Sequence, residues 1–82
     1  MRYFAYSLNQ IWEIEQKIKK KEIASVFQVI LSESAHIKRF TWCLLNLNIN
    51  FKRSPLGSGI TIFYVDMNIP FFLSPKEDPN IK

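Results

Sequence analysis

The sequence of 82 residues predicts one small α+β domain in which a single amphipathic helix packs on an antiparallel sheet. Three observations lead to this expectation. Isoleucines recur every three or four residues between 11 and 18, the spacing of one helix face. Apolar residues alternate with asparagines between 45 and 51, as in a half-buried strand. Hydrophobic residues form 48% of the chain, which excludes an intrinsically disordered protein.

The helix is expected at about residues 8–21. Ser7 stands three positions before Gln10, the spacing at which an N-cap hydroxyl accepts a hydrogen bond from the first turn. Lysines crowd the other end, where they oppose the partial negative charge of the last carbonyl groups. In residues 2–6, Tyr3 and Ala5 alternate with Phe4 and Tyr6, which favours a short first strand.

Residues 23–31 are compatible with two structures. Their apolar residues fit helical spacing, and they also form a β-branched run of strand length. At about 100° per residue, their helical stripe would be rotated by roughly 130° from that of residues 8–21. One straight helix cannot bury both stripes, so a break is expected near residues 20–22. We favour a strand for residues 23–31, with a second helix as the alternative.

Residues 38–51 and 60–67 are expected to pair as a β-hairpin. The segment between them holds the two glycines of the chain, which predicts a long, mobile loop. Residues 69–73 are expected to continue along an edge of the sheet, where Pro70 is tolerated. The expected order of elements is therefore β-α-β-β-β.

Residues 1–73 are expected to form the domain, and residues 74–82 an irregular tail that contains two prolines. No charge-free run reaches the length of about 20 residues that a membrane-spanning helix needs, and no signal-peptide pattern is present. An intracellular protein, cytoplasmic or organellar, is therefore expected. An excess of isoleucine, lysine, phenylalanine and asparagine indicates AT-rich codons, typical of a phage, a mobile element, a low-GC bacterium or an organelle.

Groups that could carry catalysis are sparse in this sequence. His36 is the only histidine and Cys43 the only cysteine, whereas a zinc site needs three or four ligands. Cys43 lies in an apolar run, where thiols are usually inert. The sequence therefore predicts no enzyme, no metal and no cofactor. A small nuclease or transferase that uses His36 with Asp66 or Glu33 is the weakest alternative.

Basic residues outnumber acidic ones, with a net charge of +4. Eight of them form a candidate basic patch in three clusters, which are Lys17, Lys19, Lys20 and Lys21, then Lys38 and Arg39, and then Lys52 and Arg53. Aromatic residues lie between these clusters, and a basic rim around exposed rings can bind single-stranded nucleic acid. An RNA- or DNA-binding module is therefore one hypothesis. The alternative is that the lysines are solvated and the aromatic residues fill the core.

Three aromatic residues are candidate anchors for a protein partner. Trp12 lies off the isoleucine stripe, and Phe71 and Phe72 are neighbours that cannot point to the same face of a strand. Exposed aromatic side chains mark interfaces. We therefore expect a non-enzymatic binding protein: a small adaptor, inhibitor or assembly subunit. Its partner is expected to be another protein or a second copy of the chain, with the lysines steering it toward acidic surfaces.

Overall fold

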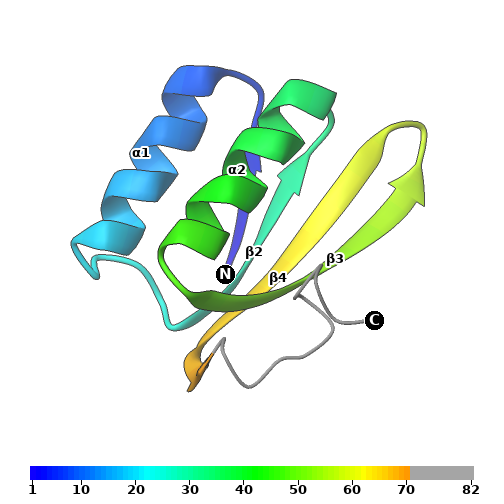
Figure 1. Ribbon diagram of the computed structural model, residues 1–82. Coiled ribbons are helices and arrows are strands. Elements are labelled where there is room, and N and C mark those ends of the chain that lie inside the picture. The colour runs from blue at the N-terminus through cyan, green and yellow to red at the C-terminus, as the bar shows by residue number, and fades with distance from the viewer. Residues whose placement is uncertain (71–82) are drawn as a thin grey trace.

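The computed structural model describes residues 1–70 and arranges them as two helices on one side of a four-stranded sheet (Figure 1). The elements in chain order are β1 (Arg2–Ala5), α1 (Leu8–Lys19), β2 (Val26–Leu31), α2 (Ser34–Asn46), β3 (Ile49–Gly57) and β4 (Ile60–Pro70). The α+β class is confirmed. The prediction of a single helix and of a purely antiparallel sheet is wrong.

Helix α1 begins at the predicted cap. The Gln10 amide donates to the Ser7 hydroxyl at 3.3 Å, and the Gln10 side-chain carbonyl accepts from the Tyr6 amide at 2.6 Å. These bonds satisfy amides that have no partner within the helix. The helix ends at Lys19, and Lys21 adopts a left-handed φ of 59°. This turn is the expected break, and it directs the chain into β2, the strand favoured from the sequence.

Helix α2 replaces the first part of the predicted hairpin. Residues 38–46 are helical, and strand structure resumes only at Ile49. The reason is a stripe at helical spacing, in which Phe40 and Leu44 are fully buried against the sheet. Burial of these side chains outweighs the local alternation of leucine and asparagine. Asn48, with a left-handed φ of 56°, redirects the chain from helix to strand.

The strand order in the sheet is β1-β2-β4-β3. β1 and β2 are parallel, whereas β4 is antiparallel to both of its neighbours. β1 and β2 can be parallel because the crossover helix α1 connects them, whereas a tight turn can join only antiparallel strands. The sheet is therefore mixed.

Strands β3 and β4 extend through most of the predicted loop. They are joined at Ser58 and Gly59, whose φ values of 55° and 81° are both positive. This combination is the one that a type I′ turn requires, and its twist matches the flanking strands. The pairing of β3 with β4 shifts register at two places, between Ile49 and Phe51 and between Pro55 and Gly57.

The hydrophobic core lies between the helices and the sheet. The ring of Phe40 meets that of Phe63 edge to face, with centroids 5.0 Å apart. Phe51 lies 5.9 Å from Phe63, and Tyr3 packs edge to face on Phe27 at the same distance. Among residues 1–70, no helix is long and apolar enough to cross a membrane.

Candidate binding surfaces

One face of the sheet carries no helix from residues 1–70, because α1 and α2 both cover the other face (Figure 1). Successive strand residues point to opposite faces, so the residues that alternate with the buried ones point away from the helices. We call this surface the open face. Its residues are Arg2, Phe4, Val26, Gln28, Ile30, Lys52, Ser54, Ile62, Tyr64 and Asp66.

An apolar row crosses three strands of the open face. Phe4 pairs with Ile30, and Ile30 pairs with Ile62. Phe4 is 51% exposed. Val26, which lies on the same face of β2 two register rows away, is 56% exposed. A sheet with one solvated face normally carries polar residues there. The apolar row is therefore unusual for a surface that meets only water.

A second row, next to the first, is polar and basic. It runs across all four strands as Arg2, Gln28, Tyr64 and Lys52. The Arg2 Nε donates to the Gln28 side-chain oxygen at 3.0 Å, which connects the side chains of β1 and β2. Basic side chains thus stand at both outer strands, with the half-exposed ring of Tyr64 between them.

A shallow hollow of about 320 Å³ lies at one end of the open face. Its apolar lining includes the exposed side chains of Val26, Tyr64 and Ile69. Asp66 and Lys52 also line it. The hollow therefore has room for one large apolar side chain beside groups of either charge.

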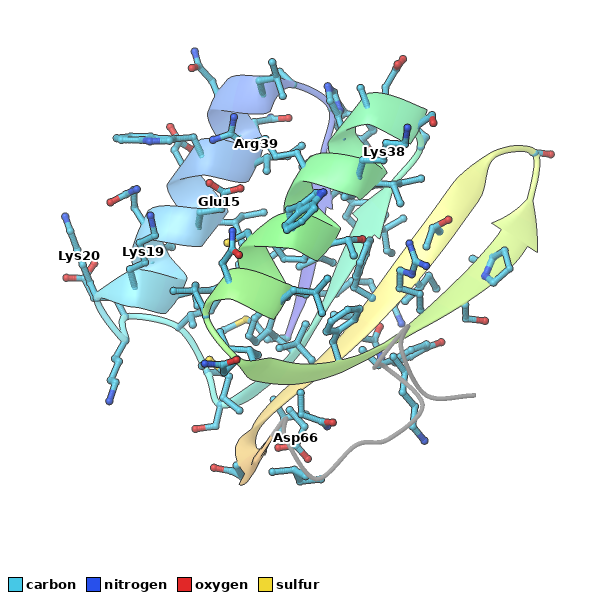
Figure 2. The ribbon with its side chains drawn as sticks, in the orientation of Figure 1. Glu15, Lys19, Lys20, Lys38, Arg39 and Asp66 are labelled. Atoms are coloured by element: carbon cyan, nitrogen blue, oxygen red, sulfur yellow. The ribbon has the colours of Figure 1, made fainter. Side chains whose placement is uncertain are left out.

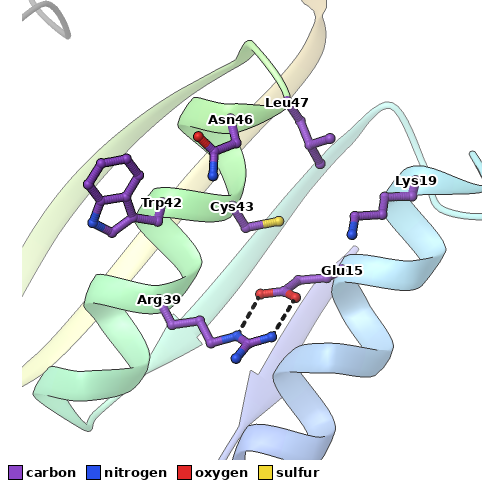
Figure 3. Close-up of a pocket in the computed structure, with 7 residues that line it drawn as sticks. All are labelled: Glu15, Lys19, Arg39, Trp42, Cys43, Asn46 and Leu47. Atoms are coloured by element: carbon purple, nitrogen blue, oxygen red, sulfur yellow. Dashed lines mark hydrogen bonds and ion pairs between the residues drawn. The ribbon is translucent and has the colours of Figure 1, made fainter.

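A groove of about 380 Å³ separates α1 from α2 on the other side of the molecule. Figure 3 shows its lining residues, which are Glu15, Lys19, Arg39, Trp42, Cys43, Asn46 and Leu47. Glu15 is only 5% exposed, and Arg39 donates to both of its carboxylate oxygens, at 3.2 and 3.3 Å. This hydrogen bonding and the charge of Glu15 raise the pKa of Arg39. The pair satisfies a charge that would otherwise be buried alone.

The thiol of Cys43 faces the same groove (Figure 3). Burial raises its pKa to about 11, and the charge of Glu15 acts in the same direction. Lys19 and Arg39 oppose these effects without overcoming them. The thiol is therefore protonated at neutral pH and is a poor nucleophile there.

The side chains proposed for a nuclease or transferase, which are His36 with Asp66 or Glu33, do not all lie close together. His36 lies on α2, whereas Asp66 points to the open face on the other side of the sheet. Glu33 precedes α2 as its N-cap. The His36 Nδ1 is buried without a hydrogen-bond partner among residues 1–70. In the same part of the chain, no three His, Cys, Asp or Glu side chains cluster as metal ligands do.

The eight residues of the candidate basic patch do not form one surface. Figure 2 shows Lys19, Lys20, Lys38 and Arg39 on the helix layer. Arg39 is engaged by Glu15, and Lys52 points to the open face. The Arg53 Nη1 donates to the Thr41 hydroxyl on α2 at 3.3 Å. The remaining two members, Lys17 and Lys21, lie on α1 and in the turn after it.

Of the three predicted anchors, Trp12 is 53% exposed on α1, whereas Phe71 and Phe72 lie outside the described residues. The structure adds Phe4 and Trp42 as exposed aromatic residues, with Trp42 63% exposed. The alternation of Phe4 with its neighbours in a short strand was the signal that could have identified it. Trp42 has no such local signal, because its exposed position depends on α2, where the sequence predicts a strand.

No family model matches the chain, and neither a curated protein nor a solved structure matches it. A function for the protein is therefore inferred from its surfaces alone.

Proposed function

We propose that this protein is a non-enzymatic binding protein that docks on a protein partner through the open face. The observation that carries this proposal is the apolar row of Phe4, Ile30 and Ile62, continuous in register on the face without a helix. A sheet face of this composition is normally covered by another layer. A partner would supply that layer.

Burial of the exposed apolar side chains of the open face would contribute part of the binding free energy. Full burial of a side chain such as Val or Phe stabilises a complex by about 1.5–3 kcal/mol relative to full exposure. Phe4 and Val26 are each about half exposed, so each retains roughly half of that gain for binding. Association costs at least about 4 kcal/mol. The apolar row therefore needs support from the hollow and from the charged residues around it.

The remaining observations agree with binding rather than catalysis. The Cys43 thiol is held protonated, and His36 and Asp66 lie on opposite sides of the sheet. The basic residues are distributed over both layers instead of lining one cleft. Such a distribution suits long-range attraction to an acidic partner more than a substrate pocket.

Replacement of two exposed side chains tests this proposal. Phe4→Thr and Val26→Thr keep good strand formers and remove apolar surface from the open face. A tagged double variant is expected to lose a protein partner that the unchanged chain retains from extracts of its host. Leu8→Gln is the matched control, because Leu8 is 52% exposed but lies on α1. Circular dichroism checks that all variants fold.

Docking on the open face would be contradicted if the double variant retained the same partner. It would also be contradicted if the Leu8→Gln control lost that partner. A second copy of the chain is a further possible occupant. Light scattering distinguishes it, because a dimer would be disrupted by the same double variant.

Nucleic acid is the second candidate ligand, and one observation favours it. The row of Arg2, Gln28, Tyr64 and Lys52 places basic groups at both ends and an exposed ring between them. Phosphates could contact the basic ends while a base stacks on the ring. Only Lys52 belongs to the basic patch predicted from the sequence. The test is the anisotropy of labelled oligo-dT and oligo-U, whose binding should weaken with salt and with Tyr64→Ala.

A further inference from the structure

We propose that the segment which docks on the open face is an amphipathic α-helix with acidic residues on both flanks of its apolar stripe. This inference rests on the proposed function, because it names the partner that the same face would take. The helix would lie along the two central strands, β2 and β4.

The width of the open face sets the size of this partner. Arg2 on β1 and Lys52 on β3 belong to one register row and are separated by three strand spacings. At about 4.8 Å per spacing, their backbones are roughly 14 Å apart. An α-helix with its side chains is about 10–12 Å across. One helix therefore fits between the two basic residues, whereas a second sheet would cover them.

The length of the central strands sets the length of the helix. The six residues of β2 are all paired with β4. At about 3.3 Å per residue they span roughly 20 Å. A helix rises about 1.5 Å per residue, so roughly 13 residues, between three and four turns, match this span.

The apolar stripe of such a helix has its counterpart on the two central strands. Val26 and Ile30 on β2 and Ile62 and Tyr64 on β4 lie under the proposed axis. The polar side chains of Gln28 and Asp66 lie between and beside them. The hollow of about 320 Å³ beside Val26 and Tyr64 has room for one large side chain as an anchor. A helix presents residues at i, i+3, i+4 and i+7 to such a surface.

The charged residues on the two sides of the proposed helix position indicate which charges the flanks of the bound helix should carry. Arg2 stands on β1, at one side of the proposed axis, and its Nε donates to the Gln28 side-chain oxygen. Lys52 forms no ion pair within residues 1–70. The acidic residue of the open face, Asp66, lies beside Val26 and outside the row of Arg2 and Lys52. Acidic residues on both flanks of a bound helix would therefore meet a basic side chain on each side.

The experiment uses two synthetic 14-residue peptides with the same leucine stripe, one with glutamates and the other with lysines on both flanks. Each is labelled and titrated with the full chain at low salt. The acidic peptide is expected to bind about tenfold more tightly, because two exposed ion pairs replace two repulsions. The double variant Arg2→Glu, Lys52→Glu should reverse this preference. The matched control Lys20→Glu, Lys38→Glu changes net charge equally on the helix layer and should retain it.

Equal binding of the two peptides, binding of neither, or reversal by the control variant as well would overturn the inference. Three other results would also overturn it by identifying a different occupant. These are a dimer that competes with the peptide, tighter binding of oligo-dT than of the acidic peptide, and stronger peptide binding after Phe71→Asp and Phe72→Asp. None of the peptide results depends on capture of the natural partner, so the two proposals can fail separately.

Discussion

The guanidinium of Arg39 on α2 holds the carboxylate of Glu15 on α1 through two hydrogen bonds, although the residues are 24 positions apart. Glu15 is buried and Arg39 is about half exposed. This pair is the only salt bridge within residues 1–70, and it connects two helices that are otherwise separated by a groove. The pair therefore adds a charged contact between the two helices, which both also pack on the shared core.

Removal of Arg39 alone should destabilise the domain. Arg39→Leu leaves the Glu15 carboxylate buried without its partner, and a lowering of the thermal midpoint by several degrees is expected. The double variant Glu15→Leu, Arg39→Leu should recover most of this loss, because a well-packed apolar pair can replace a buried ion pair. Thermal unfolding of the four proteins of this cycle measures the coupling. Additive effects of the two single changes would show that the pair contributes nothing.

Cys43 should react slowly with alkylating reagents. Its pKa of about 11, against an ordinary value of 9.0, leaves about 100-fold less thiolate at pH 7.5. The rate of carboxamidomethylation should rise with pH until about pH 11, and urea-unfolded chain should react at the rate of a free thiol. Equal rates for folded and unfolded protein at pH 7.5 would disprove the protected environment.

The same pKa predicts how stability depends on pH. The folded chain binds the Cys43 proton more tightly than the unfolded chain, so this contribution to stability is fully present below about pH 9. It is lost as the pH rises from 9 to 11. Cys43→Val should therefore show a smaller decline of the unfolding midpoint over this interval. An identical decline in both proteins would assign the effect to other groups.

Tryptophan fluorescence can report which surface a partner covers. Trp12 and Trp42 are both exposed on the helix layer, opposite the open face. A partner on the open face should leave their emission and its quenching by acrylamide unchanged. A blue shift that disappears in Trp12→Phe would instead support Trp12 as an anchor, as the sequence suggests. Trp42→Phe separates the two contributions.

Core substitutions distinguish the observed helix α2 from the strand expected at residues 38–51. In the structure Leu44 is fully buried and Leu45 only partly so. Leu44→Ala should therefore cost about 2–5 kcal/mol of unfolding free energy, and Leu45→Ala clearly less. Urea denaturation measures both. The opposite order would follow if residues 45–51 alternated as one strand.

The predictability of each element depended on how local its signals were. Ser7, Gln10 and the isoleucine stripe lie within α1, so its start and its buried face could be read from the sequence. Residues 45–50 carry an alternating pattern that conflicts with the helical stripe containing Phe40 and Leu44. Only packing against the sheet resolves that conflict.

Features that join distant segments had no local signal. The parallel pairing of β1 with β2 depends on where α1 packs, and the contact of Glu15 with Arg39 depends on how both helices lie. The open face likewise follows from the strand order, because Phe4, Ile30 and Ile62 become neighbours only in the folded sheet. The exposed tryptophan of α1 was predictable, since Trp12 lies off the apolar stripe of its own helix.

The outer strands of the sheet are poor templates for adding a strand from another molecule. β3 shifts register twice and contains Pro55, which has no amide to donate, and its Lys52 and Arg53 repel a like strand. β1 offers only four residues. Molecules that meet edge to edge therefore gain few hydrogen bonds, and growth of a continuous intermolecular sheet is disfavoured. Within residues 1–70, the sheet edges thus oppose fibril growth although the adjoining open face carries an apolar row.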